Sequence, residues 1–171
     1  LGKLDKSAEI VFYYAGHGLP DENKHPYLIP VDVSAINMKQ NGIALKSLYT
    51  SLSSSQAKKI TVFLDACFSG GILKERSVEQ SSKAMLELYK LPSRKAMTSG
   101  TMTTVPDESV FIKYLMKNLT ENDSRLLSAD QLFRNFKIAV IHNSPRGLVP
   151  QYGVIAFAGD EGGDFIFLKR D

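Results

Sequence analysis

One histidine and one cysteine stand out in this 171-residue sequence, because each closely follows a short apolar run. His17 lies in Tyr-Ala-Gly-His-Gly (residues 14–18), and Cys67, the only cysteine, lies in Asp-Ala-Cys-Phe-Ser-Gly (residues 65–70). A thiol with a pKa of about 8.5 needs a neighbouring imidazole or oriented N–H groups to be an effective nucleophile at neutral pH. The pair predicts nucleophilic catalysis in which His17 takes the thiol proton and later protonates a leaving amine. The backbone N–H groups of Gly18 and Cys67 are the expected oxyanion donors.

The elements before these two residues must bring them together. Residues 9–15 and 60–64 are β-branched and aromatic runs that end in glycine-containing loops, which is typical of buried strands. Between them, apolar residues recur at a spacing of three to four and predict an amphipathic helix over about 43–58. A helix between two apolar strands indicates a βαβ unit in a parallel sheet. His17 and Cys67 are therefore expected side by side at the carboxyl edge of the sheet, where open α/β sheets bind ligands.

The remaining segments complete one α/β domain. Residues 26–33 are extended but too rich in proline for a central strand, so an edge or loop is expected. The polar segment 72–95 is expected to cross the surface as a mobile or processed loop, with a short helix around 83–89. Further elements are expected in this order: a strand over 95–99, a helix through 111–119, a helix after the N-cap Ser128, and strands over 152–158 and 165–168.

Composition excludes several classes of protein. The hydrophobic fraction of 43% and the charged fraction of 23% are those of an ordinary globular chain. A net charge of +3 is too small to require a nucleic-acid or membrane partner, and no apolar run approaches the roughly 18–20 residues that span a bilayer. A single cysteine excludes an internal disulfide and a multi-cysteine metal site. We therefore expect a soluble, cytoplasmic protein without a nucleic-acid, membrane or metal partner.

The two motifs resemble those of the caspase-like cysteine peptidases (clan CD, family C14), and in particular their bacterial metacaspase-like and paracaspase-like branch. Fifty residues separate His17 from Cys67, about the separation found in caspases. Residues 98–100, 109–111 and 162–165 extend the likeness. The resemblance implies a three-layer α/β/α sandwich with a mostly parallel central sheet. It also implies an endopeptidase, or its zymogen, that works through an acyl-enzyme and requires no cofactor, with calcium activation like that of many metacaspases left open.

The resemblance also implies a substrate class. Caspases hold a substrate aspartate with arginines, whereas metacaspase-like and paracaspase-like relatives carry an acidic residue two positions before the cysteine. Asp65 occupies that position. A carboxylate at the base of the S1 pocket pairs with Arg or Lys through charge-assisted hydrogen bonds, so cleavage of proteins or peptides after Arg or Lys is expected. Asp107 or Glu108 stands where relatives often add a second pocket acid.

Two further expectations come from the family pattern. Two strands and two helices normally precede the histidine-bearing strand, and one of those strands pairs with it. The strand over 9–15 is therefore expected to need an N-terminal companion segment, because otherwise it exposes an apolar edge. The loop over 72–95 also carries basic residues that suit self-processing by an enzyme with this specificity. The candidate processing sites are Lys74, Arg76, Lys83, Arg94 and Lys95.

Each assignment has a structural alternative. Cys67 is then an inert buried thiol, His17 an ordinary turn residue and Asp65 a cap of the following turn. Asp107 and Glu108 begin a helix, the basic residues of 72–95 form a solvated surface, and Tyr13 and Tyr14 pack in the core. The corresponding protein is a catalytically silent or autoinhibited caspase-like scaffold, or another Cys–His amide hydrolase. No third side chain that orients His17 is evident, so the backbone alone is a sufficient explanation.

Overall fold

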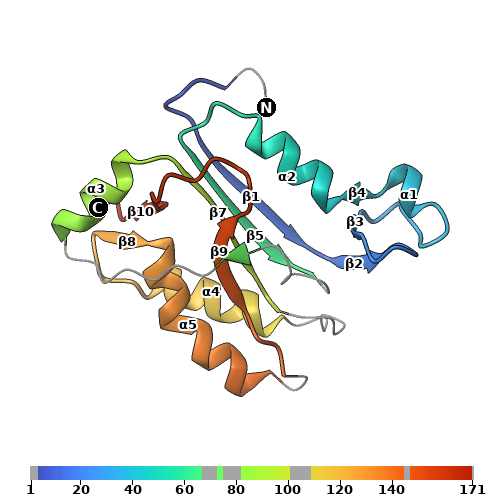
Figure 1. The fold of residues 1–171 in the computed structure, drawn as a ribbon. Coiled ribbons are helices and arrows are strands. Elements are labelled where there is room, and N and C mark those ends of the chain that lie inside the picture. The colour runs from blue at the N-terminus through green and yellow to red at the C-terminus, as the bar shows by residue number, and fades with distance from the viewer. Residues whose placement is uncertain (1–3, 67–72, 75–81, 101–108, 145–146, 171) are drawn as a thin grey trace.

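The computed structural model of the chain describes residues 4–66, 73–74, 82–100, 109–144 and 147–170. Four predicted site residues lie outside these ranges: Cys67, Arg76, Asp107 and Glu108. The described part forms three layers, in which a central sheet carries one helix on one face and two helices on the other (Figure 1). No helix in the described ranges is long and apolar enough to cross a membrane.

The central sheet has five strands in the order β1-β5-β7-β9-β6. The neighbouring strands β1, β5 and β7 run parallel, whereas β9 is antiparallel to both β7 and β6. This arrangement confirms the expected mostly parallel sheet. The strands are β1 (Glu9–Ala15), β5 (Lys59–Asp65), β6 (Leu73–Lys74), β7 (Ser93–Thr98) and β9 (Gln151–Ile155).

The βαβ unit is confirmed, since α2 (Leu45–Ser53) connects the parallel neighbours β1 and β5. The helix is shorter than expected, because Ile43 and Ala44 form the short strand β4 and a serine-rich segment follows Ser53. Alternate residues of β5 point toward α2, which places Ile60, Val62 and Leu64 in one hydrophobic cluster with it. This packing fixes the position of β5 relative to α2.

The opposite face of the sheet is covered by α4 (Val110–Thr120) and α5 (Ala129–Asn143) (Figure 1). Phe111 and Phe136 from these helices meet edge to face, with ring centroids 5.5 Å apart. Both helices begin with a serine N-cap, and the Ser128 side chain accepts a hydrogen bond from Gln131 N as the sequence predicts.

Two small sheets flank the central one. β2 (His17–Pro20), β3 (Pro26–Ile29) and β4 (Ile43–Ala44) form a three-stranded sheet, so the proline-rich segment is its middle strand and not an edge. β8 (Leu126–Ser128) pairs with β10 (Ile166–Leu168). The remaining helices are α1 (Met38–Asn41) and α3 (Ser82–Lys90).

The segment 72–95 differs from its expected loop. α3 confirms the short helix, but β7 begins at Ser93 and places Arg94 and Lys95 inside the central sheet, each 7% exposed. Arg94 Nη2 donates to the carbonyl oxygen of Ala57 at 2.6 Å, and Lys95 Nζ lies 3.3 Å from Asp164 Oδ1. Arg94 and Lys95 are therefore wrong as processing sites, because the peptide bonds of a buried central strand are inaccessible to a protease.

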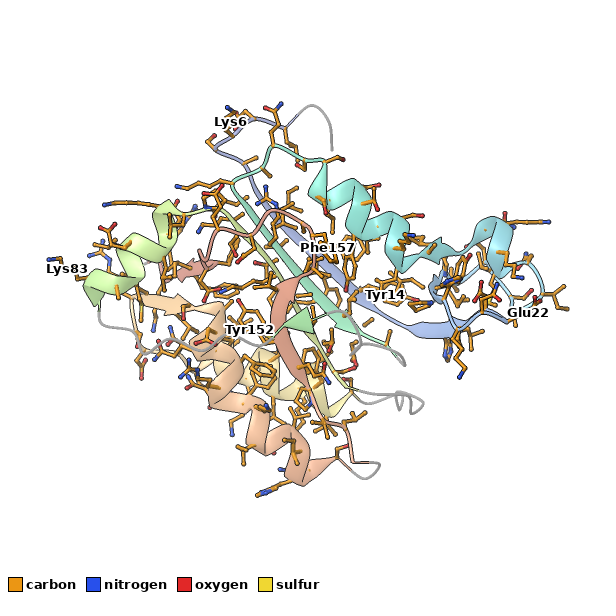
Figure 2. The ribbon with its side chains drawn as sticks, in the orientation of Figure 1. Lys6, Tyr14, Glu22, Lys83, Tyr152 and Phe157 are labelled. Atoms are coloured by element: carbon orange, nitrogen blue, oxygen red, sulfur yellow. The ribbon has the colours of Figure 1, made fainter. Side chains whose placement is uncertain are left out.

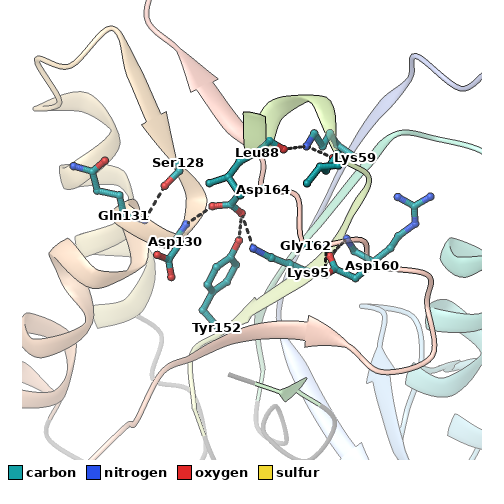
Figure 3. Close-up of polar contacts among 12 residues, drawn as sticks. Lys59, Leu88, Lys95, Ser128, Asp130, Gln131, Tyr152, Asp160, Gly162 and Asp164 are labelled. Carbon is teal, nitrogen blue, oxygen red and sulfur yellow. Dashed lines mark hydrogen bonds and ion pairs between the residues drawn. The ribbon is translucent and has the colours of Figure 1, made fainter. Parts of the chain in front are cut away.

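A buried polar cluster is centred on Asp164 (Figure 3). The Asp164 carboxylate accepts hydrogen bonds from the Tyr152 hydroxyl, from Lys95 Nζ and from the backbone N–H of Asp130. Lys59, the first residue of β5, donates to the carbonyl oxygens of Leu88 and Leu91 at 2.7 and 2.5 Å. Burial lowers the pKa of Lys59 to about 8. These contacts join the start of β5 to α3.

β1 forms one border of the central sheet. In the described part of the chain it pairs with β5 alone, and one of its faces leaves Val11 and Tyr13 about half exposed. An exposed strand edge presents unpaired N–H and C=O groups to any segment that can extend the sheet.

Candidate active site

The carboxyl ends of β1 and β5 meet at one edge of the sheet. Ala15 is in register with Asp65, and the Gly16 N–H donates a hydrogen bond to the Asp65 carbonyl oxygen at 3.1 Å. His17 is the next residue after Gly16, and Cys67 follows Asp65 by two positions. The backbone thus joins the histidine motif directly to the residue that leads into the cysteine motif. Cys67 itself lies outside the described residues, so its place in the site stays a prediction.

His17 begins the small sheet that leaves the end of β1. Its side chain is exposed, whereas the next residue, Gly18, is buried and pairs with Leu28 of β3. No hydrogen bond joins the His17 imidazole to a side chain among the described residues. The ring is therefore accessible from solvent, and its position depends on the backbone of β2.

Asp65 ends β5 with its side chain inside the protein. The residue is 1% exposed, and its Oδ1 atom has no hydrogen-bond partner among the described residues. Burying a carboxylate oxygen without a hydrogen-bond partner generally costs several kcal/mol of free energy. A cationic ligand that pairs with the carboxylate would offset this cost. The Tyr13 side chain is near enough to sense this charge. Burial and the charge of Asp65 together raise the pKa of Tyr13, although Tyr13 is half exposed and does not pack in the core as expected.

Ser99 is a polar residue of this edge that residue-by-residue sequence reasoning missed. It directly follows β7, and its N–H donates to the Leu64 carbonyl oxygen at 2.9 Å. Its buried hydroxyl has no hydrogen-bond partner within the described ranges. Thr61 and Ser93 also carry unpartnered hydroxyls in the described structure, but they lie in mid-strand and at the opposite edge. The likeness of residues 98–100 to the family was the only sequence signal for Ser99.

The other predicted site residues are spread more widely. The backbone of Lys74 lies in β6, and exposed Lys83 lies near the start of α3 (Figure 2). Asp107 and Glu108 lie outside the described residues, so the second pocket acid is untested. Within the described ranges no three His, Cys, Asp or Glu side chains gather closely enough to hold a metal ion.

Residues 2–154 match the family model of the caspase domain of peptidase C14, and the match spans both motifs and the β1-α2-β5 unit. The chain belongs to the caspase-domain family. A search of the curated proteins finds no match for it. The caspase domain is a cysteine peptidase domain, so the family supports a hydrolase with a cysteine nucleophile. It also accounts for the fold of this caspase-domain chain, with helices on both faces of a mostly parallel sheet.

Proposed function

We propose that this caspase-domain protein is a cysteine endopeptidase of the metacaspase-like or paracaspase-like kind that cleaves after Arg or Lys, with Cys67 and His17 as its catalytic residues. The observation that carries the proposal is the hydrogen bond from Gly16 to Asp65, which joins the two motifs at one edge of the sheet. Thiol-dependent peptide hydrolysis requires a cysteine nucleophile and a nearby histidine base, and the two motifs would supply both at this edge.

The proposed reaction proceeds in two halves. The Cys67 thiolate attacks the peptide carbonyl carbon, a C–S bond forms, and the N–H groups of Gly18 and Cys67 donate to the oxyanion. Protonated His17 then gives its proton to the amine as the C–N bond breaks, which leaves a thioester. In the second half His17 takes a proton from water, the resulting hydroxide attacks the thioester, and the C–S bond breaks. The acid product leaves, and the dyad is again a Cys67 thiolate beside a protonated His17, which is the state in which the reaction began.

Asp65 supports the basic specificity. Its buried carboxylate has an oxygen without a partner in the described part of the chain, at the edge where the two motifs meet. A guanidinium there would form charge-assisted hydrogen bonds, and the Ser99 hydroxyl at the end of the next strand supplies a further acceptor. Lysine offers the same charge as a point donor, so Arg is the preferred residue and Lys is second.

Turnover of fluorogenic peptides that end in Arg, Lys, Asp or Leu tests this proposal. We expect kcat/KM to decrease in the order Arg, Lys, Leu, Asp, because the Asp65 carboxylate attracts cations and repels anions. Cys67→Ala protein is the control for contaminating peptidases, and each assay is run with and without added calcium.

Preferred cleavage after Asp would contradict the S1 assignment. No turnover of any peptide under either calcium condition would instead favour the scaffold alternative.

Self-processing is proposed at the basic residues that remain as candidates: Lys74, Arg76 and Lys83. Lys83 projects from α3 on the side of the molecule away from the carboxyl ends of β1 and β5, so cleavage there requires a second molecule (Figures 1 and 2). Lys74 and Arg76 follow the nucleophile motif more closely in the chain. Intact-mass measurements on wild-type and Cys67→Ala protein should show fragments ending at these residues in the wild type alone. The same fragments in equal amounts from both proteins would exclude self-cleavage.

A further inference from the structure

The Tyr14 hydroxyl lies at the junction of the central sheet and the small sheet that begins with His17 (Figure 2). It is 2.8 Å from the His17 carbonyl oxygen and 2.9 Å from the Ile29 carbonyl oxygen, and it accepts a hydrogen bond from the Ile29 N–H at 3.1 Å. His17 and Ile29 are partners in the antiparallel β2–β3 ladder. One hydroxyl on β1 therefore contacts both residues of the pair at which β2 begins.

Gly16, which directly precedes His17, leaves room for this contact. A Cβ atom on Gly16 would lie 2.8 Å from the Tyr14 hydroxyl oxygen and 3.0 Å from the ring carbon that carries it. The first distance is shorter than real Cβ contacts show and the second is tighter than most of them, so a side chain at position 16 would displace the Tyr14 hydroxyl from its present place. The ring itself packs against the hydrophobic cluster beneath α2, which holds the hydroxyl in place.

We propose that Tyr14 is a positioning residue that sets the backbone of His17, and through it the imidazole, relative to the end of β5. The inference rests on the proposed Cys67–His17 dyad. In the described structure no side chain holds the imidazole, so the His17 backbone determines where the ring can reach. A displacement of about 1 Å in a catalytic group can cost about 10²-fold in rate. Hydrogen bonds to the His17 and Ile29 backbone restrict displacements of this kind.

Tyr14→Phe tests the role, because it keeps the packed ring and removes only the hydroxyl. We expect kcat toward an Arg-ended peptide to fall about 10-fold to 100-fold, with KM changed less than about threefold. Tyr27→Phe is the matched control and should keep wild-type kcat, since Tyr27 lies in β3 of the same sheet and pairs with Leu19 instead of His17. Thermal unfolding of each variant shows whether the effect is one of stability alone.

A second readout follows the dyad without turnover. Cys67 is the only cysteine, so the rate of iodoacetamide alkylation against pH reports its thiolate. A well-placed His17 stabilises the thiolate and moves the midpoint of this profile below that of a free thiol. We expect Tyr14→Phe to move the midpoint toward the position found in His17→Ala, whereas Tyr27→Phe should match the wild type. A purely structural loss would lower the unfolding temperature without moving the midpoint of the folded protein.

The outcomes separate this inference from the function on which it rests. If His17→Ala has the wild-type alkylation profile, the dyad is wrong. If His17→Ala moves the profile and Tyr14→Phe leaves both it and kcat unchanged, the dyad holds and the positioning role is wrong. Should Tyr14→Phe fail to fold, Gly16→Ala replaces it, because the added Cβ keeps the hydroxyl but displaces it. An unchanged kcat and profile in that variant would equally overturn the role.

Discussion

Replacement of either Cys67 or His17 by Ala is expected to lower kcat/KM toward an Arg-ended peptide by about 10³-fold or more. Without the thiol no acyl-enzyme forms, and without the imidazole the thiol stays mostly protonated at neutral pH and the amine leaves without a proton. The double variant should be no less active than the worse single variant, because the two residues act as one unit. Progress curves for the three variants and the wild type, at matched concentrations of folded protein, provide the measurement.

His25→Ala is a suitable control for the loss of an imidazole. His25 is an exposed histidine whose Nδ1 atom lies 3.3 Å from Asp21 Oδ2, in the connection between β2 and β3. It should keep activity within about threefold of the wild type. Retention of more than about a tenth of wild-type activity by Cys67→Ala or His17→Ala, in protein free of other peptidases, would contradict the dyad.

Asp65→Asn is expected to lower kcat/KM for an Arg-ended peptide by about 10²-fold or more, while the free energy of unfolding does not decrease. The activity falls because a buried carboxylate that pairs with a cation contributes on the order of 3–5 kcal/mol when its partner is present. Stability is retained because no described residue hydrogen-bonds to Oδ1 of the Asp65 carboxylate, so its charge is buried at a cost that the neutral amide avoids. Peptide kinetics and urea unfolding of the same preparations measure both quantities.

The matched control for this change is Asp123→Asn, which neutralises an exposed carboxylate that pairs with Lys169 on the surface. It should alter neither kinetics nor stability beyond a few tenths of a kcal/mol. A different pattern for Asp65→Asn, with lower stability and unchanged preference for Arg over Leu, would favour the alternative in which Asp65 caps the following turn.

The parallel pair β1 and β5 was predictable because its strands are continuous apolar runs. Residues 9–15 and 60–64 are short, flanked by glycine-containing loops and separated by a helical pattern, so local composition identifies both strands. The same pattern places their ends at one edge, and the register of Ala15 with Asp65 confirms it. The sequence therefore sufficed to predict that β1 and β5 end at one edge of the sheet.

Charged residues in a buried strand were not predictable in this way. Arg94 and Lys95 resemble loop residues because their charge suggests solvent, yet they bond to the Ala57 carbonyl and to Asp164, which are remote in the sequence. Nothing within a local window reveals such partners. β7 therefore begins before the predicted strand, and the predicted loop was too long at that end.

Tyr14 and Ser99 were missed for a related reason. The role inferred for Tyr14 depends on β3 returning next to β1, and this places Ile29 beside a hydroxyl fifteen residues earlier in the chain. Ser99 is of interest only because it is buried without a partner, which is a property of three-dimensional packing. Sequence motifs predict which groups react, whereas contacts such as those of Tyr14 and the burial of Ser99 become evident only when the strands are assembled.

Covalent labelling by an irreversible probe tests the central claim most directly. A peptidyl acyloxymethyl ketone with Arg next to the reactive group should add once to the wild-type protein, because the Cys67 thiolate displaces the carboxylate leaving group to form a thioether. Peptide mapping should place the adduct on Cys67. Cys67→Ala should show no adduct, His17→Ala should react far more slowly, and the matched Asp probe should label little. An adduct at another residue, or faster labelling by the Asp probe, would contradict the account.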